Sequence, residues 1–412
     1  MIGNCEFRIQ DCLAQIELQE ESIGAWEHVD SAGALSRARE LDSITIQGPL
    51  HGMALGVKDI IDVAGMPTRC GSPIYARNIA KMDAACVALA KAAGAIVIGK
   101  TATTELATFQ PAKTRNPENL EHTPGGSSSG SAAAVAAGMV PIAMGTQTAG
   151  AVIRPASYCG VIGFKPTFGQ VPRAGVKMQS DTLDTVGVFS RTVDDAMKWY
   201  AAMTGARTYT ADATGSAPLR ITIITNFLDR ADANMVEAIA KAADALSAGD
   251  ARVKELRLPA IFDEAPTDQR MIQLSEMARF YALEYTSFRE LLSEQLVAMI
   301  EEGLAIDHNA YMAAMARADV LRKQADGLLG DCDAWLMPAA PGAAPKGLKS
   351  TGDPIFSRAN TLLEQPAINL PVYRNENRMP LGLQLIGARQ QDKKLLATAQ
   401  RTLDILRYGA HD

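Results

Sequence analysis

Two neighbouring stretches of this chain consist almost wholly of small residues: GGSSSGSAAAVAAG at 125–138 and GTQTAGAVIRPASYCGVIGFKPT at 145–167. The first predicts a loop and then an Ala-rich helix over 131–137, which Gly138 ends. A strand over 140–144 leads into a second loop, 145–150. Gly-rich backbone can approach a ligand closely, and its N–H groups can hold an anion or a developing oxyanion. The two stretches therefore indicate a site built largely from backbone.

Outside this region, short apolar runs alternate with helical periods, which is typical of an α/β fold. Helices are expected in the first forty residues, where apolar residues recur at helical spacing from Ile9 to Leu18. No internal repeat or low-complexity linker is visible, which favours one continuous domain. Further strands are predicted at 53–57, 95–98, 220–224, 252–256, 333–337, 367–371 and 381–386, and helices at 84–93, 235–246, much of 271–329, and 393–406.

Composition limits the class of protein. The 412 residues are 47% hydrophobic and 21% charged, as in a soluble globular chain, and the net charge of −6 argues against a nucleic-acid partner. The longest apolar run, 132–144, is interrupted by Gly138 and Pro141 and is too short to span a bilayer. The N-terminus lacks a signal-peptide pattern. We therefore expect a cytoplasmic enzyme with a small-molecule partner and no membrane partner, and a homodimer is left open.

Cysteine and histidine patterns indicate no metal site. The six cysteines form no C-x-x-C pair, and the five histidines form no H-E-x-x-H motif. We expect reduced thiols and no metal. So few histidines also leave few candidates for a Ser-His-Asp triad.

Three interpretations of the Gly/Ser-rich loop compete. A phosphate cradle is disfavoured because Ser131, not lysine, follows Gly130, so the G-x-x-x-x-G-K-[ST] pattern is absent. A purely structural loop would have Ser129 or Ser131 as the N-cap of the helix. This interpretation leaves the second small-residue loop unexplained. The third is catalysis by a hydroxyl nucleophile, with the loop amides as the oxyanion hole.

A serine nucleophile needs a base, and a buried lysine can serve because desolvation disfavours its ammonium form. Lys58 is the candidate, since it ends an apolar strand. The alternative is an ordinary strand-end lysine in a salt bridge, for which Asp59 is adjacent. Lys100, after the strand at 95–98, is the other lysine in such a position.

These motifs, with GVKD at 56–59 and PLGLQLIG at 380–387, resemble those of the amidase signature family. The resemblance extends from about 50 to 406 and is weakest across 205–330. It implies a single α/β/α domain with a large mixed central sheet, and amide hydrolysis by a Ser–cis-Ser–Lys triad without metal or organic cofactor. We accordingly divide 1–412 into N-terminal helices (1–50), a catalytic core (50–205), a helical cover with extra strands (205–330), and closing strands and helix (331–412).

The resemblance also implies roles for individual residues. The family lysine falls on Lys58 and the bridging serine, preceded by a cis peptide, falls on Ser127. Oxyanion-hole amides fall on three consecutive loop residues. Ser129 and Thr146 are expected to hold the lysine and the bridging serine, or else to satisfy local backbone. The resemblance places these amides at Thr148, Ala149 and Gly150.

The chain departs from the family at the nucleophile. That serine lies 24 residues after the bridging serine, at 127 + 24 = 151, and position 151 here is alanine. Alanine has no Oγ to attack a carbonyl, so the chain as given should form no acyl-enzyme. We interpret Ala151 as an engineered Ser→Ala substitution. The alternatives are a naturally silent binding protein, or attack by the hydroxyl of Ser128 or Ser129.

Arg154 indicates the substrate. In Ala-Val-Ile-Arg-Pro the arginine lies one place later than in more familiar members of the family. On a strand, that step would turn it into the site, where it could bind a substrate carboxylate. The alternative is a structural ion pair. This arrangement, with STGDP at 350–354 and QPAINLPV at 365–372, looks like malonamidase-type members, which act on small amides bearing a carboxylate. A ureido substrate and neutral amides are left open.

Overall fold

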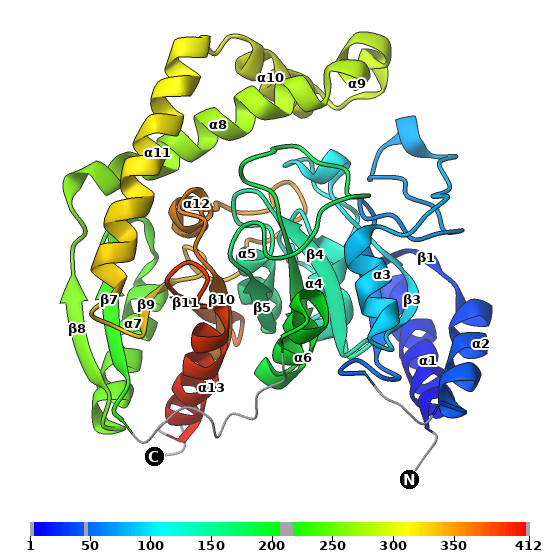
Figure 1. Cartoon of the computed structure of the whole chain (residues 1–412), viewed down its shortest axis with the longest axis horizontal. Helices are drawn as coiled ribbons and strands as arrows, with labels where there is room; N and C mark the ends of the chain where they lie inside the picture. Colours follow the sequence, from blue (N-terminus) through cyan, green and yellow to red (C-terminus); the bar gives the residue numbers. More distant parts are fainter. Residues whose placement is uncertain (1–3, 45–47, 207–216, 409–412) are drawn as a thin grey trace.

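One mixed β-sheet extends across the molecule (Figure 1) in the computed structural model, which describes residues 4–44, 48–206 and 217–408. Its strand order is β1-β3-β2-β4-β6-β5-β10-β11-β9-β7-β8. The strands are β1 (Trp26–Val29), β2 (Ala54–Lys58), β3 (Ile96–Thr101), β4 (Ile142–Gln147), β5 (Ile162–Lys165), β6 (Thr185–Ser190), β7 (Arg220–Ile224), β8 (Arg252–Leu256), β9 (Ala334–Pro338), β10 (Ala367–Arg374) and β11 (Pro380–Ile386).

Helices cover both faces of this sheet, so strand residues are buried on either side. In β2, Leu55 and Val57 pack in one core and Ala54 in the other, as the two-residue repeat of a strand requires. The first core includes side chains of α3 (Ala85–Ala92), α6 (Val193–Thr204), α7 (Ala233–Ala248) and α13 (Asp392–Tyr408). The second includes side chains of α1 (Cys5–Ile23), α2 (Ser31–Asp42), α4 (Ser129–Ala136) and α5 (Ile153–Cys159).

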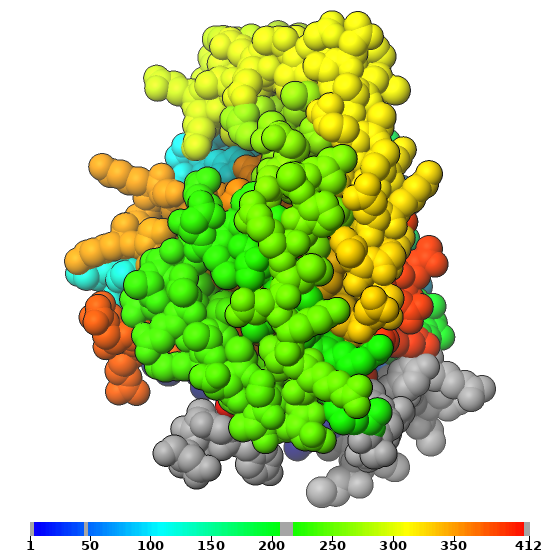
Figure 2. Space-filling view, turned by 90° about the vertical axis from the view of Figure 1, so that its left-hand side faces the viewer, coloured from blue at the N-terminus to red at the C-terminus, as the bar shows by residue number. Residues whose placement is uncertain are grey.

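A helical cover passes over one end of the sheet, at the top of Figure 1. It consists of α8 (Ala265–Phe280), α9 (Ala282–Ser287), α10 (Glu294–Leu304) and α11 (His308–Leu329). Figure 2 shows these segments, yellow-green to yellow, over the top and along one side of the molecule. Beneath the cover lies α12 (Ile355–Leu362), which packs against α8. No helix of the described residues is long and apolar enough to cross a membrane.

The predicted α/β class with a large mixed sheet is confirmed. Helices α8 to α11 and strands β9 to β11 lie in the segments that we assigned to the helical cover and to the closing strands. The expected N-terminal helices are present, but Leu18, which we placed on the apolar face of the first, is 77% exposed. Sequence patterns did not predict six elements: β1, β5, β6, α5, α6 and α12. Three of these are strands of four to six residues, too short to show a clear period.

Two local predictions near the small-residue loops are wrong. Helix α4 begins at Ser129, so neither Ser129 nor Ser131 is its N-cap, and the N-cap Ser128 makes no side-chain cap bond. The segment at 153–159 is helical, so the strand argument for the direction of Arg154 does not hold. On a helix, a one-residue step rotates a side chain by about 100° instead of reversing it.

Candidate active site

Lys58, the last residue of β2, is fully buried and faces two hydroxyl groups. Its Nζ lies 2.7 Å from Ser127 Oγ and 2.8 Å from Thr146 Oγ1. Burial lowers the pKa of Lys58 to about 7, and the charge of Asp184 opposes this shift. No carboxylate within the described chain forms an ion pair with Lys58. The amine is therefore poised to exist without its charge near neutral pH.

Lys100, the other lysine considered, has the salt bridge that we weighed for Lys58. Its Nζ lies 3.1 Å from Asp59 Oδ1 and also donates to Thr68 Oγ1 and to the Pro67 carbonyl. Val57 of β2 is in register with Lys100 of β3, so the two lysines lie on neighbouring strands. Asp59 is thus occupied by Lys100, and Lys58 is left with hydroxyl partners.

The three serines that follow Gly126 differ in their surroundings. Ser127 follows a cis peptide bond and lines a cavity with its hydroxyl on Lys58. The Ser128 hydroxyl bonds to the backbone of Thr146, and the Ser129 hydroxyl donates to the Gly125 carbonyl at 2.7 Å. Ser129 therefore satisfies local backbone and does not hold the lysine, whereas Thr146 does contact it. Neither Ser128 nor Ser129 lines the cavity, so neither is placed to attack a ligand there.

The loop at 148–151 is fixed through its side chains and carbonyls. The Gln147 Oε1 accepts from the N–H groups of Val152 and Ile153, at 3.0 Å each, where α5 begins. Thr361 of α12 donates to the Ala149 carbonyl at 3.0 Å. In the part of the chain that the structure describes, the N–H groups of Ala149, Gly150 and Ala151 donate to no protein acceptor. These amides are available to a ligand oxygen.

This loop and Ser127 surround a small cavity. Its volume is about 20 Å³, close to the space that one water molecule needs. Ser127, whose hydroxyl contacts Lys58, and Ala151 thus line the same cavity. Its lining residues are Ala107, Thr108, Phe109, Gly126, Ser127, Thr148, Ala149, Gly150, Ala151, Arg154, Gln179 and Gln273.

Arg154 of α5 lines the same cavity and is 3% exposed. Its Nη2 donates to the Gly126 carbonyl at 2.7 Å and to Thr351 Oγ1 at 3.1 Å. The Nε and Nη1 atoms are buried with no hydrogen-bond partner. No described carboxylate pairs with this guanidinium, so the structural ion pair that we considered is not formed. A buried cation with unused donors favours an anionic ligand.

Asp184 was missed by sequence reasoning, although it is the carboxylate whose charge acts on Lys58. It accepts from Thr148 Oγ1 at 2.5 Å and from the N–H groups of Gln179 and Ser180. Burial raises its pKa to about 6, against the hydrogen bonds from Thr148 and from the two backbone amides. Asp184 directly precedes β6, and a polar residue at a strand end could have marked it as a candidate, but β6 itself was not predicted.

A second missed group links the cover to the site. Gln269 of α8 donates to the Thr148 carbonyl at 2.8 Å, and nothing in the local pattern of α8 marks it. Among the described residues, no group of three or more His, Cys, Asp or Glu side chains could hold a metal ion. The chemistry available at the site is thus that of hydroxyls, an amine, a guanidinium and backbone amides.

Comparison with known proteins places this geometry in a family context. A model of the amidase family matches residues 8–396. The chain is 31% identical over 454 aligned positions to a glutamyl-tRNA(Gln) amidotransferase subunit from Agathobacter rectalis, covering 96% of this chain and 89% of that protein.

Solved structures show the same fold. A crystal structure of an amidase superposes with a TM-score of 0.88 at 29% identity, covering 96% of this chain and 94% of the other. The native peptide amidase of Stenotrophomonas maltophilia superposes with a TM-score of 0.82 at 27% identity, covering 98% and 94%. The likeness therefore includes the cover as well as the sheet.

Proposed function

Because this chain belongs to the amidase family, we propose that it is a hydrolase of small amide or ureido compounds bearing a carboxylate, in which Ala151 replaces the attacking serine. The observation that supports this most directly is the contact of buried Lys58 with Ser127, in the cavity that Ala151 also lines. A lysine whose pKa is about 7 can act as a base without histidine.

The proposed reaction applies to the chain with serine at 151. Neutral Lys58 accepts the proton of the Ser127 hydroxyl while Ser127 Oγ accepts the proton of the attacking hydroxyl. The freed oxygen bonds to the amide carbonyl carbon, and the carbonyl oxygen becomes an oxyanion. The proton returns through Ser127 to the departing nitrogen, which leaves as ammonia. Water then repeats the path and releases the acid.

The loop amides supply the electrostatic part of the proposal. Among the described residues, the N–H groups of residues 149–151 meet no protein acceptor, and the sequence-based assignment of Thr148, Ala149 and Gly150 overlaps with this set. Their orientation is held by Gln147, Thr361 and Asp184. Such preorganised donors stabilise an oxyanion without rearranging when the charge forms.

Arg154 supports a carboxylate-bearing substrate. Its Nε and Nη1 have no protein partner in a cavity where an unpaired cation is costly. Each edge of the guanidinium that can bind a carboxylate through two nitrogens includes Nη2, and both Nη2 hydrogens already donate to protein oxygens. A carboxylate bound in this way would therefore replace one of these hydrogen bonds, for example the one to Thr351.

The experiment is ammonia release by Ala151→Ser with malonamate and succinamate, against propionamide and butyramide as matched neutral amides. Turnover confined to the carboxylates supports the whole proposal. Turnover of the neutral amides alone retains the hydrolase and removes the role of Arg154. In the same background, Arg154→Gln should raise KM for the carboxylates by about 10- to 100-fold and leave the neutral amides unchanged.

A naturally silent binding protein is the second candidate, and the alanine at 151 is the observation that favours it. Such a protein would bind a small carboxylate at Arg154 without breaking it. Absence of turnover by Ala151→Ser, together with stabilisation of the Ala151 protein by malonamate, would favour this candidate over the hydrolase.

A further inference from the structure

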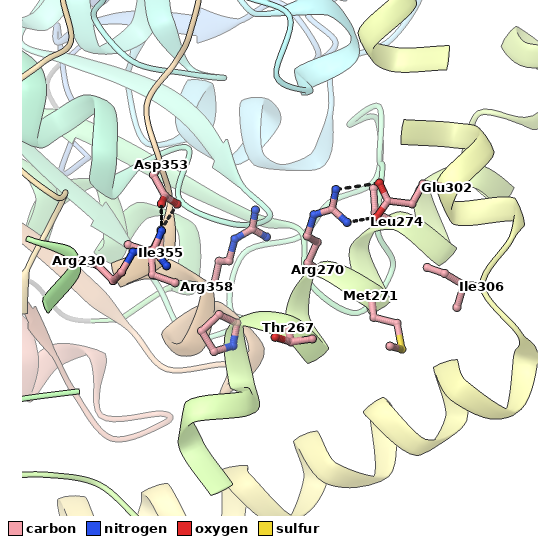
Figure 3. A pocket seen from close by; sticks show the side chains of 11 residues that line it. Arg230, Thr267, Arg270, Met271, Leu274, Glu302, Ile306, Asp353, Ile355 and Arg358 are labelled. Carbon is pink, nitrogen blue, oxygen red and sulfur yellow. Dashed lines mark hydrogen bonds and ion pairs between the residues drawn. The ribbon is translucent and has the colours of Figure 1, made fainter. Parts of the chain in front are cut away.

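A second, larger pocket lies between α8, α10 and α12 (Figure 3). Its volume is about 430 Å³, within the range of sites that hold small molecules. It shares no lining residue with the cavity at Ser127. The two spaces are therefore distinct.

Charge in this pocket is not balanced. Three arginines line it, against the two carboxylates of Asp353 and Glu302. Each carboxylate already has an arginine: Asp353 pairs with Arg230 at 3.2 Å, and Glu302 pairs with Arg270. Arg358 lies between these two ion pairs (Figure 3). The pocket thus has an excess of one positive charge.

Arg358 forms no ion pair with any described residue. Its Nη1 donates to Gln269 Oε1, an uncharged acceptor. Burial lowers the pKa of Arg358 to about 10; the positive charges of Arg154 and Arg270 act in the same direction, and the carboxylate of Asp353 opposes them. The group remains charged at neutral pH and partly buried, and the carboxylate that acts on it, that of Asp353, already pairs with Arg230. An anion that enters the pocket would supply that counterion.

The rest of the lining is apolar. Met271 and Leu274 of α8, with Ile306 and Ile355, provide surface for a hydrocarbon group. A hydrated inorganic anion would gain nothing from this surface, whereas an organic anion would bury its carbon chain there. The lining therefore favours a ligand with one charged end and one apolar end.

We propose that this pocket binds a small organic carboxylate, with Arg358 as its charge contact and the side chains of Met271, Leu274, Ile306 and Ile355 around its hydrocarbon part. Gln269 separates this site from the oxyanion loop, since it accepts from Arg358 and donates to the Thr148 carbonyl. The proposal does not depend on the reaction proposed above, because the Ala151 protein is the one to be tested.

The test is isothermal titration of the Ala151 protein with hexanoate, with hexanamide as the matched uncharged probe and inorganic phosphate as the anion without a carbon chain. Hexanoate should bind saturably, and hexanamide and phosphate at least tenfold more weakly. Arg358→Gln should weaken hexanoate binding by at least tenfold, since a charge-assisted contact is lost. Arg154→Gln should weaken it less than Arg358→Gln does.

Two further variants control for folding. Arg257→Gln removes an exposed arginine paired with Asp263 outside the pocket and should leave binding unchanged. Arg358→Lys keeps the charge and should retain binding better than Arg358→Gln, at an unchanged melting temperature without ligand. The proposal is overturned if hexanoate does not saturate, if hexanamide or phosphate binds equally well, or if Arg154→Gln and not Arg358→Gln abolishes binding.

Discussion

Two lysines on neighbouring strands, Lys58 and Lys100, are both fully buried and yet have different chemistry. Lys100 faces a carboxylate, a carbonyl and a threonine hydroxyl, whereas Lys58 faces two hydroxyls. Burial lowers the pKa of both groups. Since only Lys100 has an adjacent counterion, its ammonium form is compensated in place, and the ammonium form of Lys58 is not.

The comparison shows that burial alone does not make a lysine a base. The carboxylate of Asp59 is bound by Lys100, although Asp59 follows Lys58 directly in the chain. Burial also raises the pKa of Asp59 to about 6, so both partners bear a desolvation cost. Because Lys100 binds the carboxylate of Asp59, that carboxylate does not stabilise the charged form of the neighbouring Lys58.

The largest effect is expected from removing the proposed base. In the Ala151→Ser background, Lys58→Met should lower kcat/KM for amide hydrolysis by about 10³-fold, because general base catalysis is lost. Ammonia release measures it. Lys198→Met, at a partly exposed lysine on α6, is the matched control and should retain full activity. Equal losses in the two variants would remove the distinction between Lys58 and any other lysine.

The second-largest effect is the loss of stability expected when the ion pair between Asp59 and Lys100 is broken. Asp59→Asn leaves Lys100 buried without its counterion and should lower the free energy of unfolding by about 3 kcal/mol. Urea denaturation measures this loss. The double variant Asp59→Asn, Lys100→Met should lose less than Asp59→Asn alone. If the double variant is the less stable of the two, the pair is not what stabilises this region.

The pH dependence of amide hydrolysis tests whether Lys58 acts in its uncharged form. An amine accepts a proton only when it is neutral, so kcat/KM of Ala151→Ser should rise about tenfold per pH unit below pH 7 and level off above it. The sign follows from the lowered pKa, because the active form is the deprotonated one. A rate that falls as pH rises through 7 would mean that the ammonium is required.

The smallest effect is expected at Thr146. Thr146→Val removes one hydroxyl that accepts from Lys58 and should lower kcat/KM by about tenfold in the Ala151→Ser background. Since that acceptor stabilises the ammonium, the midpoint of the pH profile should also move below 7. Ser129→Ala is the matched control, because its hydroxyl bonds only to the Gly125 carbonyl. An unchanged midpoint would show that Thr146 acts on structure alone.

Much of the fold followed from local pattern, and the misses have physical causes. Strands such as β2 and β7 were placed to within a residue or two, because their apolar runs are bounded by polar or turn residues. Helix α5 was missed because the segment around Arg154 was treated as a strand, although Pro155 is tolerated near a helix start. Arg154 lines the cavity as predicted, but from a helix and not from the strand that the argument assumed.

The sequence by itself determined the two small-residue loops, the lysine at the end of β2 and the alanine at 151, since each depends on residues close together in the chain. Tertiary structure alone decided which lysine pairs with Asp59, which donors of Arg154 stay free and where Arg358 lies. Those outcomes depend on strand register and on helix packing between segments 40 to 200 residues apart, and no local period encodes such contacts.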